Sequence, residues 1–211
     1  MLFYTLTYLL EYAFCNIFYV NIRSLECHKE DLAIDLYAQQ SRYLCLTETW
    51  ITPEENIEKA LMSRNLYHSS IGDGKGCCFL SPEEEAEVKS TANPSFQMLS
   101  VLVKEGYKLI LLYVSSNIDL QEVVTVLQEV FTDVSKTILI GDLNFDASEK
   151  NCLTRFLERR QFVQKVSKPT HKGGRIIDHV YVPQALENEI DITIMFKYYT
   201  DHASLLINLS K

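Results

Sequence analysis

Two periods of apolar and polar positions run along this chain, and they predict strands interleaved with helices. Short apolar runs bounded by turn residues indicate strands, whereas apolar residues spaced three or four positions apart indicate amphipathic helices. We expect strands over residues 17–21, 43–47, 76–80, 96–103, 108–114, 137–140, 176–182, 190–196 and 204–209. We expect helices over residues 29–41, 120–134 and 153–160.

The strand runs at 108–114 (KLILLYV) and 137–141 (TILIG) contain almost no polar alternation. Such strands need apolar cover on both faces. The pattern therefore predicts an α/β (α+β) fold, a four-layer sandwich of two packed mixed β-sheets flanked by helices. No repeat, low-complexity tract or Pro/Gly/Ser linker divides the chain, so residues 16–211 are expected to form a single domain.

The first twenty residues are unusually apolar, and Glu11 is the only charged residue among them. A basic flank and a small-residue cleavage pattern, which would indicate a signal segment, are both missing. Because residues 16–20 are needed for a core strand, residues 1–15 are expected to be an apolar extension before the domain, helical or poorly ordered. No membrane partner is expected.

Composition places the chain among ordinary globular proteins, with 47% apolar and 23% charged residues and a formal net charge of −8. A negative total argues mildly against a nucleic-acid partner, because Lys and Arg supply most of the affinity for DNA. The charges are unevenly distributed, however: basic residues crowd between Lys150 and Arg175, where Glu158 alone opposes them. They could form one basic face or simply solvated helix and loop faces. The candidate nucleic-acid-binding residues are Arg155, Arg159, Arg160, Lys168, Lys172 and Arg175.

Polar residues of one chemical type follow several of the predicted strands. Asn21, Glu48, the Asp142–Asn144 turn, Asp178–His179 and Asp201–His202 all stand at such ends. Carboxylates and amides together with Asp-His pairs are the materials of an oxygen-ligand metal site with acid/base groups. Each alone could equally be a helix cap or a solvated turn. The six cysteines make no C-x-x-C pair, so no zinc site or disulfide framework is readable and a reducing compartment fits best.

The order of these residues, Asn…Glu…Tyr…GDxN…D…DH, resembles the signature of the endonuclease/exonuclease/phosphatase superfamily. It extends over nearly the whole predicted domain. The motifs that carry it are NIRSL from Asn21, LTETW around Glu48, Tyr113, GDLNFD around Asp142, IDHVY around Asp178 and TDH ending at His202.

The resemblance implies a role for each matching residue. Glu48 corresponds to the principal ligand of a Mg²⁺ or Mn²⁺ ion, and Asp201 completes the metal environment. Asp142 corresponds to the residue that orients or deprotonates the attacking water, and Asn144 to the amide that holds Asp142 and the phosphate in register. His202 would contact the scissile phosphate.

The remaining implied roles support this group. Asp178 would orient His202, Asn21 would lie beside the metal, and Tyr113 would donate to the phosphate or the leaving oxygen. His179 is interpreted as an ordinary strand residue, and Tyr113 or Asn144 could also be a core tyrosine or a turn residue. For phosphodiester hydrolysis this set makes physical sense, because charge accumulates on the phosphoryl and leaving oxygens.

Two stretches resemble particular branches of the superfamily. The opening NIRSL…LCLTETWI is similar to the endonuclease domains of non-LTR retrotransposons, and PTHKGGRIIDHVYV…YYTDHASLLI to the segment attached to Helitron-type transposon proteins. Val114 departs from the retroelement relatives, which often place Arg there, and the stretch between Asn144 and Asp178 is short.

The resemblance implies a transposon-derived, metal-dependent endonuclease that nicks DNA with low sequence specificity in an intracellular, nuclear setting. A catalytically lapsed remnant that acts as a binding module, or a phosphatase or phospholipid diesterase of the same superfamily, remain alternatives. The oligomeric state is open.

Overall fold

The computed structural model describes residues 15–51, 60–71, 75–85, 87–116 and 118–209. Residues 1–14 of the predicted N-terminal extension lie outside this range. Cys15 already belongs to the first strand, so the sheet begins one residue earlier than the predicted domain boundary.

Seven strands form the first sheet, in the order β12-β13-β1-β2-β5-β4-β3. Strands β1 and β2 are parallel, and the other neighbours are antiparallel. The strands are β1 (Cys15–Asn21), β2 (Tyr43–Thr47), β3 (Ala60–Leu61), β4 (Arg64–Ser69), β5 (Cys77–Ser81), β12 (Ile190–Phe196) and β13 (Ala203–Leu209).

Six strands form the second sheet, in the order β10-β11-β9-β8-β7-β6. Here β8 and β9 are the parallel pair. The strands are β6 (Glu87–Ala92), β7 (Phe96–Leu102), β8 (Lys108–Val114), β9 (Thr137–Asp142), β10 (Phe162–Gln164) and β11 (Asp178–Pro183), and the 3₁₀ helix η1 (Gln184–Glu189) leads from β11 to β12.

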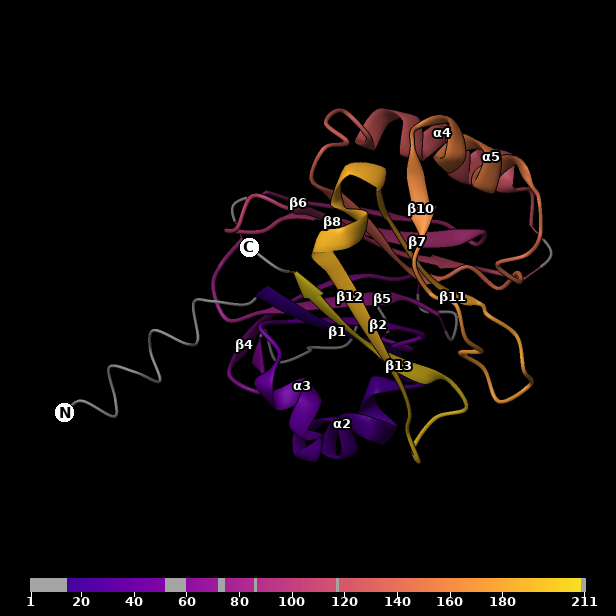
Figure 1. The fold of residues 1–211 in the computed structure, drawn as a ribbon. Helices are drawn as coiled ribbons and strands as arrows, with labels where there is room; N and C mark the ends of the chain where they lie inside the picture. The colour runs from indigo at the N-terminus through magenta and orange to yellow at the C-terminus, as the bar shows by residue number, and fades with distance from the viewer. Residues whose placement is uncertain (1–14, 52–59, 72–74, 86, 117, 210–211) are drawn as a thin grey trace.

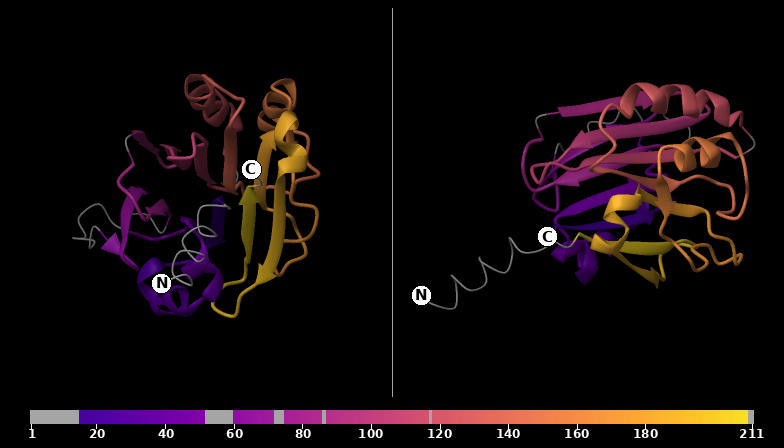
Figure 2. Two further views of the ribbon diagram at one scale, coloured as in Figure 1. Left: turned by 60° about the vertical axis from the view of Figure 1, so that its left-hand side comes forward. Right: turned by 45° about the horizontal axis from the view of Figure 1, so that its top comes forward.

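The two sheets pack face to face, and helices cover their outer faces (Figure 1). Helices α2 (Leu25–Ile34) and α3 (Leu36–Gln40) lie against the first sheet, and α4 (Leu120–Val130) and α5 (Cys152–Arg159) against the second. The layers remain distinct from two further directions (Figure 2). These four layers confirm the predicted sandwich.

The alternation of side chains along β1 shows why both faces of a strand are apolar. Ile17 and Tyr19 lie in the core between the sheets, whereas Phe18 and Val20 lie in the core beneath α2 and α3. Successive residues of a strand point to opposite faces, so a strand that is buried on both sides must be apolar throughout.

Several elements differ from the sequence-based predictions. The helix expected over 29–41 is two helices, because Asp35 has extended backbone and its carboxylate caps α3 by accepting from Tyr37 N–H at 3.0 Å. Helix α4 ends at Val130 rather than at residue 134. Strands β3, β4, β6 and β10 were not predicted. Most of the β6 side chains are exposed or half-buried at the sheet edge, which leaves no apolar pattern to detect.

No helix within the described ranges is long and apolar enough to cross a membrane.

Candidate active site

The predicted site residues meet at one edge of the sandwich because of how the strands pair. The parallel pairs β1–β2 and β8–β9 both end there, with Asn21 opposite Thr47 and Tyr113 opposite Asp142. The antiparallel strand β11 begins at the same edge, where Asp178 pairs with Asp142. Segments far apart in the sequence are thus brought to one place.

Asn21 joins the two sheets at this edge. Its side-chain nitrogen donates to Glu48 Oε1 at 2.9 Å and to Asp142 Oδ2 at 2.8 Å. Asn21 is fully buried, and its Oδ1 has no hydrogen-bond partner among the residues that the structure describes. Glu48 follows β2 with a φ of 49°, a left-handed conformation that turns the chain directly after the strand.

Asp178 holds His202 in a fixed orientation. Asp178 Oδ2 lies 2.8 Å from His202 Nδ1, and Asp178 Oδ1 accepts a hydrogen bond from the Tyr19 hydroxyl at 2.7 Å. The Thr170 hydroxyl oxygen accepts from the backbone N–H groups of Ile177 and Asp178, at 3.1 and 3.0 Å. Because Asp178 Oδ2 occupies the Nδ1 side of the ring, Nε2 is the nitrogen left for a ligand.

Burial, followed by the charge of Asp178, raises the pKa of Asp142 to about 8, although His202, the Asn144 N–H and Asn21 act in the opposite direction. Burial lowers the pKa of His202, but the hydrogen bond to Asp178 and the charges of Asp178 and Asp142 outweigh it and raise that pKa to about 9. Asp142 and the His202 imidazole therefore each retain a proton at neutral pH.

Two groups of side chains at this edge have donor atoms close enough to share a cation. One ligand atom from each of Glu48, Asp142 and His202 lies within 4.8 Å of the others, and the same holds for His171, Asp201 and His202. Glu48 and Asp142 supply carboxylate oxygens, which suit a hard divalent cation such as Mg²⁺. The unpaired Asn21 Oδ1 supplies a further oxygen beside them. The donor set of the first group therefore fits the predicted metal.

Asp201 lies beside this group but is held differently from Glu48. Its Oδ2 forms an ion pair with Arg23 Nη1 at 2.7 Å and lies 3.4 Å from His171 Nε2. Arg23 Nε also lies 3.9 Å from Glu48 Oε2, so the guanidinium stands between the two carboxylates.

Asn144 and Tyr113 complete the predicted set. The backbone N–H of Asn144 donates to Asp142 Oδ1 at 2.9 Å, and its side-chain amide donates to the Val114 carbonyl at 2.8 Å. Asn144 has a φ of 56°, as a tight turn after β9 requires. Burial, then the charges of Glu48 and Asp142, raise the pKa of Tyr113, which keeps its hydroxyl protonated.

The predicted nucleic-acid-binding residues do not all lie at this edge. Lys172 N–H donates to the Asp201 carbonyl at 2.9 Å, and Arg175 lies in the same turn; Lys168 is exposed in the loop that leads to it. Arg155 is exposed in the first turn of α5.

Arg159 and Arg160, by contrast, lie at the far end of the second sheet. They precede Phe162, which pairs with Pro183 at the opposite end of β11 from Asp178. At roughly 3.3 Å per residue, that strand places them about 16 Å or more from Asp178. The Arg160 guanidinium stacks over the Phe156 ring at 4.0 Å.

Four further residues of this edge were not predicted from the sequence: Arg23, Tyr19, Thr170 and His171. Tyr19 could have been predicted from the two-residue period of a strand. It lies two residues before Asn21 and therefore on the same face. Thr170 and His171 belong to the quoted PTH stretch, but only the backbone bridge between His171 and His202 brings them to the site.

His179 lies within the second sheet, as expected of a strand residue. It is fully buried, and its Nε2 lies 3.0 Å from the Phe145 carbonyl and 3.1 Å from the Ile176 carbonyl.

No protein-family model and no curated protein matches this chain. Solved structures do. A 3′-5′ exonuclease from Neisseria meningitidis superposes with a TM-score of 0.77 at 16% identity, covering 93% of this chain and 100% of the exonuclease. An AP endonuclease from Archaeoglobus fulgidus gives 0.71 at 17% identity, covering 92% and 98%. The endonuclease domain of TRAS1, a telomere-specific non-LTR retrotransposon, gives 0.67 at 13% identity, covering 92% and 97%. The chain therefore has the fold of the endonuclease/exonuclease/phosphatase superfamily.

Proposed function

We propose that this protein is a divalent-metal-dependent phosphodiester hydrolase that nicks DNA, derived from a mobile element. One observation carries the proposal. Side chains from five separate segments, Asn21, Glu48, Asp142, Asp178 and His202, form one connected group of hydrogen bonds and close donor atoms at a single edge.

Glu48 and Asp142 would hold the cation, with the side-chain oxygen of Asn21, Oδ1, beside them. A bound Mg²⁺ or Mn²⁺ would supply positive charge to the phosphate and leaving oxygens. A nearby positive charge also favours the ionised form of a carboxylate, so metal binding would lower the raised pKa of Asp142. In its ionised form Asp142 can accept a proton from water, and Asn21 and the Asn144 N–H keep its oxygens in place.

His202 would act on the phosphate itself. Its raised pKa keeps the imidazole charged at neutral pH, so Nε2–H can donate to a phosphoryl oxygen while Asp178 holds Nδ1. This donor opposes charge that grows in the transition state. Tyr113, whose hydroxyl remains protonated, is proposed as a second donor.

DNA is the proposed substrate for two reasons. Solved structures with the same fold include DNA-processing enzymes, and Lys and Arg side chains lie beside the site. One structure of the Neisseria enzyme, named there as a 3′ phosphatase, is bound to a product DNA hairpin. In this chain Arg23 forms an ion pair with Asp201, and Lys172 and Arg175 belong to the turn whose backbone bonds to Asp201. They could contact phosphates without reading bases, which agrees with low sequence specificity.

A plasmid assay tests the proposal. Supercoiled plasmid is incubated with the protein in Mg²⁺, in Mn²⁺ or in EDTA, and open-circle product is measured. We expect nicking with either metal and none in EDTA. Asp142→Asn and His202→Ala should lower the rate by orders of magnitude with DNA affinity nearly intact. If wild-type protein binds plasmid but never nicks it, the chain is a binding module instead.

Metal binding has a readout of its own. A ligand at one hundred times its Kd stabilises a folded protein by about 2.7 kcal/mol. Mg²⁺ or Mn²⁺ should therefore raise the melting temperature by several degrees, and Glu48→Gln should largely remove that shift. An unchanged shift in Glu48→Gln would place the cation elsewhere, for example at His171 and Asp201.

A further inference from the structure

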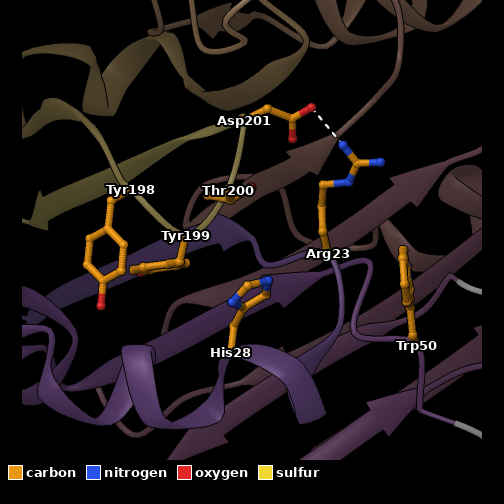
Figure 3. A pocket seen from close by; sticks show the side chains of 7 residues that line it. All are labelled: Arg23, His28, Trp50, Tyr198, Tyr199, Thr200 and Asp201. Carbon is orange, nitrogen blue, oxygen red and sulfur yellow. Dashed lines mark hydrogen bonds and ion pairs between the residues drawn. The ribbon is translucent and has the colours of Figure 1, made fainter.

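A pocket of about 380 Å³ opens next to the proposed active site, and four of its lining residues carry aromatic rings (Figure 3). His28 comes from α2, Trp50 from the loop after β2, and Tyr198 and Tyr199 from the turn between β12 and β13. None of these rings takes part in the reaction proposed above.

Three of these rings form hydrogen bonds with two carboxylates, Asp31 and Asp35, at the helices that cover the first sheet. The Tyr198 hydroxyl donates to Asp31 at 2.5 Å, and His28 Nδ1 lies 3.0 Å from the same side chain. The Tyr199 hydroxyl donates to Asp35 at 3.2 Å. Rings held in this way lose little freedom when a ligand packs against them, so their faces are prepared for binding.

Trp50 is both exposed and strained. It is 43% exposed, and its φ of 56° is unusual for a bulky residue. The backbone N–H of Trp50 donates to the Lys75 carbonyl at 3.0 Å, which helps to hold that conformation. Strained residues of this kind gather at ligand sites, where the surrounding structure maintains them.

The pocket and the proposed active site share a wall. Arg23 lines the pocket and lies 3.9 Å from Glu48, and the Thr200 hydroxyl donates to the backbone carbonyl of Asn21 at 2.9 Å. Asp201, also in the wall, immediately precedes His202. A DNA strand with its phosphate at His202 would therefore bring an adjoining nucleotide to the pocket.

We propose that this pocket binds an unpaired nucleobase next to the scissile phosphate, so that the preferred substrate is DNA with unpaired nucleotides rather than continuous duplex. The inference rests on the proposed function. Bases stack on aromatic side chains with little regard to sequence because every base has a π-face. In a continuous duplex those faces are covered by neighbouring pairs. The volume is at the lower end of the roughly 300–1,000 Å³ of small-ligand sites, which suits one nucleotide.

Trp50 is the single tryptophan of the chain, so its fluorescence reports on the pocket directly. The full chain in EDTA is titrated with three DNAs of one sequence: a single strand, a duplex with a short unpaired bubble, and a fully paired duplex. We expect the first two to quench Trp50 strongly and the paired duplex to quench it weakly.

Two variants that keep the reporter sharpen the test. Tyr198 is 74% exposed, so Tyr198→Ala removes a stacking face with little effect on the fold. It should weaken binding of the unpaired DNAs about tenfold, as removing one stacked aromatic ring does, and leave the paired duplex unchanged. Phe196→Ala is the matched control, because Phe196 is 54% exposed and lies outside the pocket. It should change neither the binding of the unpaired DNAs nor that of the paired duplex.

Equal quenching by all three DNAs, or equal weakening of all three by Tyr198→Ala, would overturn the pocket proposal while leaving the nuclease intact. A protein that neither binds nor nicks any DNA would overturn both.

Discussion

Asp142 and Asp178 are direct partners across the antiparallel strands β9 and β11, so two buried carboxylates face each other at the edge of one sheet. Such a pair is unfavourable unless donors and cations surround it. Asn21 and the Asn144 N–H supply donors to Asp142, and Tyr19 supplies one to Asp178. The donors around these carboxylates are therefore where substitutions should have their largest effects.

Asn21→Leu should lower the nicking rate by about 10- to 100-fold, the usual cost of removing a hydrogen-bond partner of metal-ligating carboxylates. The substitution removes the amide that Glu48 and Asp142 share. Single-turnover nicking at saturating Mg²⁺ measures the effect. Asn16→Leu, on the same strand at the end away from the site, is the control and should nick normally. Equal rates for the two variants would contradict the role given to Asn21.

Tyr19→Phe should destabilise the protein by about 1.5–3 kcal/mol, because a hydrogen bond to a buried charged group is lost. It should also slow nicking, since Asp178 then holds His202 less firmly. Tyr43→Phe is a matched control, because the Tyr43 hydroxyl donates to Glu105 at 2.7 Å away from the site. Urea unfolding and nicking rates are compared. Slower nicking in both variants would mean that lost stability alone explains the effect.

His179 should make the protein less stable in acid. Burial lowers its pKa, although hydrogen bonds to the Phe145 and Ile176 carbonyls act in the opposite direction. The unfolded imidazole therefore takes up a proton below about pH 6.5, whereas the folded one takes it up only at a lower pH. This stability is complete above pH 6.5 and is lost as the pH falls, by at most about 1.4 kcal/mol per pH unit.

Urea unfolding of wild type and His179→Gln at pH 7.5, 6.5 and 5.5, in EDTA, tests this linkage. The difference in unfolding free energy between the two proteins cancels the other titrating groups. It should shrink as the pH falls. A difference that is constant with pH would show that His179 has the same pKa in the folded and unfolded states.

Lys and Arg side chains near the site should set how strongly DNA binding depends on salt concentration. Each lost phosphate contact lowers the slope of log K against log salt by about 0.9. Lys172→Gln with Arg175→Gln should flatten the slope, because both residues lie in the turn beside Asp201. Arg159→Gln with Arg160→Gln, which removes the same charge at the far end of β11, should leave it unchanged. The reverse result would move the DNA path onto the helical face.

The local pattern was sufficient to predict most of the sandwich. Strands β2, β5 and β8 were predicted within a residue of their bounds, because burial on both faces leaves a nearly uninterrupted apolar run. Strand β6 at the sheet edge and the break at Asp35 were not predictable in this way. An exposed edge strand needs no apolar face, and a short polar residue inside a helical pattern becomes a cap only when the chain turns there.

The candidate site, too, was predictable from the sequence only in part. By itself the sequence determined the residue types: carboxylates, an amide and a histidine that follow apolar strands, in an order that resembles one superfamily. Only the tertiary structure decided that Tyr19, Arg23 and Thr170 support them, that Arg159 and Arg160 lie away from them, and that Trp50 and Tyr198 line a pocket beside them. The physical reason is that the order of the strands, which brings distant segments together, is set by how the layers pack around one core and leaves little trace in the local pattern of any one segment.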